Sequence, residues 1–159
     1  MQGLRIIPDD LTHPKVQALL EAHLSNMHSL SPPESVHAFD VARLRSADVT
    51  FWTMWLGEIL VGCGALKQLN AEHGEIKSMR TRDEFRGRGA GRTMLAHIIA
   101  EATRRGYRRL SLETGSVPAF QPALRLYETA GFRYCEPFAD YVEDPYSVFM
   151  TIELAIQRS

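Results

Sequence analysis

The sequence is poor in cysteine and carries almost no net charge. Only 2 cysteines, Cys63 and Cys135, occur among the 159 residues, and their spacing matches no metal-binding motif. We therefore expect no disulfide framework and no metal, and a reducing cytoplasm is the expected location. Lysine and arginine total 18 against 19 aspartates and glutamates, a net charge of −1. So small a charge argues against partners such as nucleic acid or an anionic membrane.

Long apolar runs are also missing from the sequence. No stretch approaches the roughly 18 continuous apolar residues that a membrane-spanning helix needs, so no membrane segment is expected. Residues 1–8 do not contain the apolar run of a signal peptide. With 45% hydrophobic and 23% charged residues, the chain has the composition of a soluble globular protein. We expect one domain that spans residues 1–159.

Periodicity of the apolar residues divides the chain into strands and helices. A polar connector is expected at 70–74, and Gly62 and Gly64 are expected to mark a bulge or a close backbone contact. This order predicts a mixed α/β (α+β) fold rather than a regular doubly wound sheet. The expected strands are 4–7, 49–56, 59–66, 75–81, 109–114, 132–134 and 147–154, and the expected helices are 14–27, 36–45, 90–105 and 121–130.

The most informative stretch joins the expected strand 75–81 to the helix that follows it. Residues 86–91 read Arg-Gly-Arg-Gly-Ala-Gly, directly before that helix. The first amides of a helix have no intrahelical partner and lie at the positive end of its dipole. Glycines carry no Cβ, so an anion can approach the main chain closely. The expected guest is a phosphate or a pyrophosphate, with Arg86, Arg88 and Arg92 adding positive charge around it.

Two common phosphate-binding motifs are excluded by the residues present. The dinucleotide fingerprint Gly-x-Gly-x-x-Gly would need its third glycine at position 92, where Arg92 stands. The mononucleotide P-loop needs a Gly-Lys pair, and the sequence contains none. What remains is the pattern Arg/Gln-x-x-Gly-x-Gly/Ala at the start of a helix.

That pattern resembles the acetyl-CoA loop of the GCN5-related N-acetyltransferase (GNAT) superfamily. A second segment, 123–132, resembles the family pattern Ala-x-x-Leu-Tyr-x-x-x-Gly-Phe, and the order of elements matches the family along nearly the whole chain. Segments 75–81 and 144–150 look like one uncharacterised bacterial subgroup. The resemblance implies a central, mostly antiparallel sheet of about seven strands flanked by about four helices.

The resemblance also implies a co-substrate, acetyl-CoA, and the residues that bind it. Main-chain amides of 87–92 would hold the pyrophosphate, and strand residues 79–81 would line the pantetheine arm. No metal is implied. The implied coenzyme A-binding residues are Met79, Arg80, Thr81, Arg86, Gly87, Arg88, Gly89, Ala90, Gly91, Arg92, Gln121 and Tyr127.

The implied reaction moves an acetyl group from a thioester to a primary amine by direct attack. A general base must take the amine's proton, and an acid must protonate the departing thiolate. Tyr127 matches the family tyrosine near the sulfur, and a phenol with a reference pKa of about 10 stays protonated at neutral pH. Glu75 and Glu113 are the candidate bases. Relatives also use water molecules and main-chain carbonyls, so the sequence leaves the base open.

The acceptor amine is not readable from the sequence, and small molecules and peptides both remain open. His28 and His37 are candidate acceptor-site residues because they flank the proline loop of a region that shapes that site in the family. Tyr141 is a third candidate, since its irregular loop either closes over the acceptor or is an ordinary surface loop. Lys77 and Arg80 could bind an acceptor carboxylate, or could simply lie on a solvated strand face. Relatives often dimerise, so a homodimer is allowed.

Two other classes of function compete with the enzyme. The first is a non-catalytic acyl-CoA sensor that keeps the glycine loop; Tyr127 and the two glutamates argue against it. The second is a small nucleic-acid binder that uses the arginines of 80–92. Asp83 and Glu84 interrupt that basic patch and the net charge is −1, so nucleic acid is not an expected partner.

Overall fold

The computed structural model describes residues 3–30 and 41–155. Half of the expected helix 36–45 falls outside them, and Val41–Leu44 in the described half form α2. In chain order the elements are β1 (Leu4–Pro8), α1 (Pro14–Leu30), α2 (Val41–Leu44), β2 (Val49–Leu56), β3 (Ile59–Asn70), β4 (His73–Thr81), α3 (Ala90–Arg104), β5 (Arg109–Gly115), α4 (Gln121–Ala130), β6 (Arg133–Tyr134) and β7 (Ser147–Glu153).

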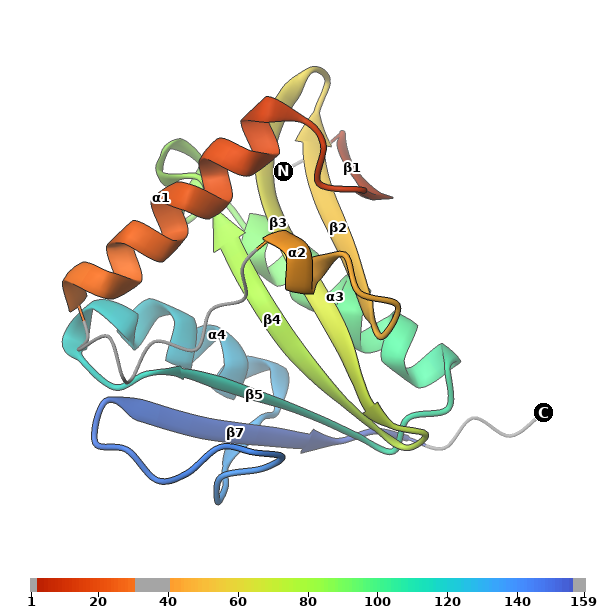
Figure 1. Cartoon of the computed structure of the whole chain (residues 1–159), viewed down its shortest axis with the longest axis vertical. Helices are drawn as coiled ribbons and strands as arrows, with labels where there is room; N and C mark the ends of the chain where they lie inside the picture. The colour runs from red at the N-terminus through yellow and green to blue at the C-terminus, as the bar shows by residue number, and fades with distance from the viewer. Residues whose placement is uncertain (1–2, 31–40, 156–159) are drawn as a thin grey trace.

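A seven-stranded sheet runs through the molecule in the order β1-β2-β3-β4-β5-β7-β6 (Figure 1). Only the β4–β5 pair is parallel, and the other neighbours are antiparallel. The mixed α+β fold with a mostly antiparallel sheet is therefore confirmed. The junction between the third and fourth strands was predicted wrongly: β3 continues to Asn70 and β4 already begins at His73. The Asn70 side chain accepts a hydrogen bond from the Glu72 amide at 2.9 Å, which closes a tight turn in place of the expected connector.

Strands β4 and β5 pair over only four residues each. The register runs from His73 opposite Arg109 to Ile76 opposite Leu112. Both strands continue beyond this point, β4 to Thr81 and β5 to Gly115, and they diverge as they do so (Figure 1). Main-chain groups on the facing edges of the two strands are therefore not paired with each other beyond Ile76 and Leu112.

An extra residue in β4 sharpens this divergence. Cys63 lies opposite Arg80 but Ala65 lies opposite Lys77. Between these two pairs β4 therefore advances by three residues while β3 advances by two, which is a β-bulge in β4. Ser78, inside this bulge, has a left-handed φ of 54°, which is unusual for a residue other than glycine. A Cβ on Gly62 would lie 2.4 Å from the Arg80 carbonyl oxygen, so the expected close contact at this glycine is confirmed.

Alternation along the strands gives the sheet two different faces. One face packs against α3 and α4 in a cluster that includes Ile76, Leu112, Met94, Ile98 and Tyr127. The opposite face is covered by α1 and α2 at its β2–β3 side, through residues that include Val16, Leu44, Phe51, Trp55 and Ala65 (Figure 1). Glu75, Lys77 and Glu113 point to this second face because they alternate with Ile76 and Leu112.

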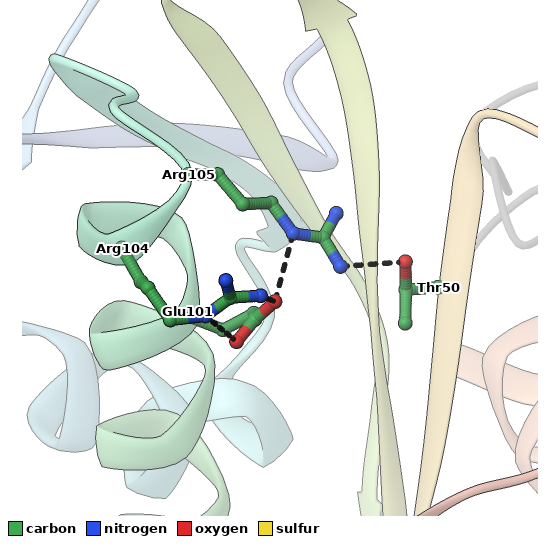
Figure 2. A network of polar contacts seen from close by, with 4 residues as sticks. All are labelled: Thr50, Glu101, Arg104 and Arg105. Atoms are coloured by element: carbon green, nitrogen blue, oxygen red, sulfur yellow. Dashed lines mark hydrogen bonds and ion pairs between the residues drawn. The ribbon is translucent and has the colours of Figure 1, made fainter.

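The C-terminal end of α3 is tied to β2 by a polar network (Figure 2). Arg105 donates to Glu101 at 3.0 Å and to the Thr50 hydroxyl at 2.8 Å, while Arg104 also donates to Glu101. Hydrogen bonds from Arg104, then from Arg105, lower the pKa of Glu101 to about 2. Gly106 follows with a φ of 85°, as expected of a residue that ends a helix. This network fixes one end of α3, while the other end lies beside the tip of β4.

Candidate active site

A short loop connects the tip of β4 to the start of α3. Gly87 and Gly89 have φ values of 75° and 89°, a left-handed conformation that glycine adopts without strain. A Cβ added to either glycine would meet no atom within 4 Å, so the main chain here borders open space. At Gly91 a Cβ would lie 3.4 Å from Leu126 and 3.6 Å from Thr81, which places the first turn of α3 against α4 and the end of β4.

The first amides of α3 are available to an anion. Gly89 is the N-cap residue, and no side chain of the described chain caps this end of the helix. Its carbonyl accepts hydrogen bonds from the Thr93 amide at 3.0 Å and from the Thr93 hydroxyl at 2.9 Å. The first turn carries no acidic residue. The open main chain and the positive end of the helix dipole together suit a phosphate group.

The arginines around this loop differ in their contacts, and not all of their positive charge is left for a ligand. Arg86 forms an ion pair with Asp83 at 3.1 Å, and Arg80 approaches the same carboxylate at 3.6 Å. Arg88 lies over the Phe85 ring, 5.9 Å from its centroid. Arg92 is exposed on the first turn of α3. Asp83 thus takes part of the positive charge that the motif supplies.

A buried polar cluster lies on the α1–α2 face of the sheet, where β4 and β5 begin to diverge. Glu75 is 3% exposed and accepts a hydrogen bond from the Tyr141 hydroxyl at 2.6 Å. Lys77, 9% exposed, donates to Glu75 at 3.2 Å and to the Tyr141 oxygen at 2.9 Å. The three side chains therefore form a closed triangle. The sequence proposed Glu75 as a base and Tyr141 for the acceptor site, and the structure brings them together across 66 positions.

Glu113 is the second carboxylate of this region. It is the first β5 residue beyond the last pair with β4, and its side chain is partly buried. Burial raises the pKa of Glu113 to about 7, the nearby Glu75 acts in the same direction, and the positive charge of Lys77 opposes both. Burial also lowers the pKa of Lys77, which Glu75 partly offsets. The site thus contains one carboxylate that changes protonation near neutral pH.

Tyr127 lies on the other side of the sheet from these groups. It is a buried residue of α4, packed with its ring 5.8 Å from that of Phe132. Burial raises the pKa of Tyr127 above its ordinary value, so the phenol is protonated at neutral pH. Gln121 begins the same helix and is exposed.

Two of the expected acceptor-site residues give no structural information. His28 lies in the last turn of α1, where the structure describes the backbone alone, and His37 lies outside the described residues. Lys77, considered for an acceptor carboxylate, instead pairs with Glu75. The sequence alone could have indicated this pair, because residues two positions apart on a strand lie on the same face of the sheet. In residues 3–30 and 41–155 no cluster of metal-ligand residues occurs, and no helix there is long and apolar enough to cross a membrane.

Comparison with known proteins identifies the family. The model of the acetyltransferase (GNAT) family matches residues 16–132. The chain is 57% identical to the uncharacterised N-acetyltransferase YsnE of Bacillus subtilis, over 92% of this chain and 97% of that protein. It is 53% identical to the uncharacterised N-acetyltransferase YedL of Escherichia coli, over 92% of each chain.

A solved structure shows the same fold. The GNAT family acetyltransferase of Elizabethkingia anophelis, determined with acetyl-CoA bound, superposes with a TM-score of 0.72 at 20% identity, over 97% of this chain and 100% of that chain. This chain therefore belongs to the GNAT family of acetyltransferases, enzymes that use an acyl-CoA co-substrate and an amine acceptor.

Proposed function

We propose that this enzyme moves the acetyl group of acetyl-CoA to a primary amine of a small molecule or peptide by direct attack. The observation that carries the proposal is that β4 and β5 diverge beyond Ile76 and Leu112. The gap in their pairing lies between two sets of functional groups, one on each face of the sheet. On one side are the open amides of α3 and the phenol of Tyr127, and on the other are the carboxylates of Glu75 and Glu113. A thioester held between the strands would be accessible to both sets.

Coenzyme A would bind along the N-terminal end of α3 and the part of β4 that is not paired with β5. The amides of residues 87–92 would receive the pyrophosphate, because the glycines leave the main chain open and no acidic residue lies in the first turn. Residues Met79 to Thr81 are half-buried and continue β4 past its last pair with β5, so their main chain could bind the pantetheine arm. Arg80, Arg86, Arg88 and Arg92 would contribute positive charge near the phosphates.

Glu113 is better suited than Glu75 to act as the general base. A base works best when its pKa lies near the working pH, and burial places the pKa of Glu113 at about 7. Glu75 is instead engaged by Lys77 and Tyr141, which hold its carboxylate by two hydrogen bonds. We assign Glu75 the role of a fixed negative charge. Two carboxylates against one lysine leave this side of the sheet attractive to a protonated amine.

Tyr127 would act as the general acid. It lies on the α3–α4 face, opposite the proposed base, so the amine would attack from one face and the thiolate would depart toward the other. Because burial keeps its phenol protonated, Tyr127 can donate a proton to the thiolate. A base and an acid on opposite faces allow both proton transfers without mutual interference. A sensor without catalysis would need neither group.

Substituting Gly89 tests the binding of coenzyme A. Gly89→Glu should abolish binding, because it places a negative charge where the pyrophosphate would lie. Gly106→Glu is the matched control: Gly106 also has a left-handed φ, of 85°, with no atom within 4 Å of an added Cβ, but follows the opposite end of α3. Calorimetric titration with acetyl-CoA should show binding for the control alone. Equal affinity in the two folded variants would contradict the proposed site.

Removing the Tyr127 hydroxyl tests the acid. Tyr127→Phe should lower kcat by about 10- to 100-fold while leaving the Kd of acetyl-CoA nearly unchanged, as expected for a group that acts on the transition state. Tyr107→Phe removes a buried hydroxyl from the same core and serves as the control. Turnover is measured as thiol release with a panel of primary amines. If Tyr127→Phe matches the wild type across pH, the acid lies elsewhere.

The pH profile distinguishes the two glutamates. The kcat/KM of the wild type should fall as pH decreases through about 7, because Glu113 then gains a proton and cannot accept another. Glu113→Gln should lower kcat/KM by about 100-fold or more and remove this inflection. Glu143→Gln alters an exposed carboxylate and should change neither. Should Glu75→Gln remove the inflection and Glu113→Gln preserve it, the assignment of the base is reversed.

A further inference from the structure

A hollow lies away from the divergence of β4 and β5, at the end of the sheet where these strands begin. Its volume is about 820 Å³, within the range of small-molecule sites. The main lining residues are His73, Arg109, Arg133, Cys135, Pro137 and Phe138. None of them belongs to the groups assigned above to coenzyme A, the base or the acid.

The floor of this hollow is a preformed polar network. His73 Nε2 lies 2.7 Å from the Ser111 hydroxyl, which lies 2.9 Å from the Thr151 hydroxyl. Arg109 donates from Nε to the Thr151 hydroxyl at 3.0 Å. Ser111 and Thr151 are fully buried, so these contacts hold His73 and Arg109 in fixed positions. A mobile surface arginine would have no such support.

The charge of the lining favours a ligand with a single negative charge. Arg133 already pairs with Glu153 at 3.2 Å, and one lining carboxylate, Glu136, adds further negative charge, so the two lining arginines can balance at most one additional negative charge. Burial, followed by the charge of Arg109, lowers the pKa of His73, so the imidazole is neutral at pH 7 and can donate or accept a hydrogen bond. A guanidinium binds a carboxylate well, whereas a doubly charged phosphate would be poorly compensated here.

One wall of the hollow is aromatic and separates it from the proposed acceptor side. The Phe138 ring lies 5.8 Å from His73, 5.1 Å from Tyr141 and 6.0 Å from Phe149, measured between centroids. Phe138 thus lies between His73 in the hollow and the Tyr141 that binds Glu75. Phe138 and Pro137 offer apolar surface to the body of a ligand.

We propose that this hollow is a second binding site, which takes a small carboxylate with an aromatic or apolar body. The carboxylate would pair with Arg109 and Arg133, and the body would pack against Phe138 and Pro137. The site is independent of the acetyl-CoA site, so it stands or falls separately from the proposed acetyl transfer.

Cys135 provides a reporter inside the hollow. Its thiol is partly buried, and burial raises the pKa of Cys135, so labelling is done at mildly alkaline pH with the uncharged reagent N-ethylmaleimide. Cys63 is buried and burial raises the pKa of its thiol to about 12, so it should stay unlabelled in the folded protein. Mass spectrometry follows the rate at Cys135 alone.

Benzoate is the probe, with benzamide and inorganic phosphate for comparison. Benzoate at ten times its Kd should slow labelling about tenfold, since protection follows 1 + [L]/Kd. Benzamide should protect Cys135 at least several-fold less, because it has no negative charge. Phosphate should also protect at least several-fold less, because it carries more negative charge than the lining can balance. Protection by benzoate should persist when acetyl-CoA is saturating.

Variants connect the protection to the two arginines. Arg109→Gln should remove the protection of Cys135 by benzoate. Arg133→Gln should also remove it, and because Arg133 is exposed, this second variant leaves the buried polar network intact. Arg108→Gln, next to Arg109 but exposed and outside the lining, should keep full protection. The proposal is overturned if benzoate gives no protection, if both arginine variants remain protected, or if phosphate protects better than benzoate.

Discussion

The attraction between an anion and the open amides at the start of α3 is the interaction on which the rest of the account depends. Two features hold these amides in position. The left-handed φ values of Gly87 and Gly89 turn the chain sharply from β4 into the helix. At the other end of α3, Arg105 connects Glu101 to Thr50 of β2. The helix is thus fixed over the sheet with its N-terminus beside the end of β4.

The sheet then determines what lies on each side of a bound thioester. Pairing between β4 and β5 stops at Ile76 and Leu112, and the extra residue near Ser78 shifts the register of β4 against β3 just beyond that point. Strand alternation places Glu75 and Glu113 on one face and the core around Tyr127 on the other. Burial raises the pKa of both groups with different results: the pKa of Glu113 reaches about 7, and the phenol of Tyr127 stays protonated. The chemistry we propose follows from this separation.

Local patterns in the sequence predicted the features that depend on neighbouring residues. The strand, glycine turn and helix around 75–104 were predictable because propensity, capping and periodicity agree there. The turn at 71–72 was missed because it depends on one side chain, Asn70, that bonds its own backbone. The left-handed Ser78 was not predictable, since no sequence rule favours that conformation for serine.

Contacts between distant segments account for the remaining differences. Tyr141 reaches Glu75 from a loop that has no regular secondary structure, so no periodicity predicts the contact. The pairing of Asp83 with Arg86 and Arg80 was likewise missed, because the spacing of charges alone does not show which side chains meet. The preference for Glu113 over Glu75 depends on burial, which only the structure supplies.

The most direct test of the central claim observes the backbone amides themselves. In nitrogen–proton correlation spectra of the labelled protein, addition of coenzyme A should shift the amide signals of Gly89 and Gly91 far more than that of Gly106, at the other end of the same helix. Pantetheine, the part of coenzyme A that carries no pyrophosphate, should shift these two signals little. If coenzyme A binds while the signals of Gly89 and Gly91 stay unchanged, the anion is not held at the start of α3 and the account is wrong.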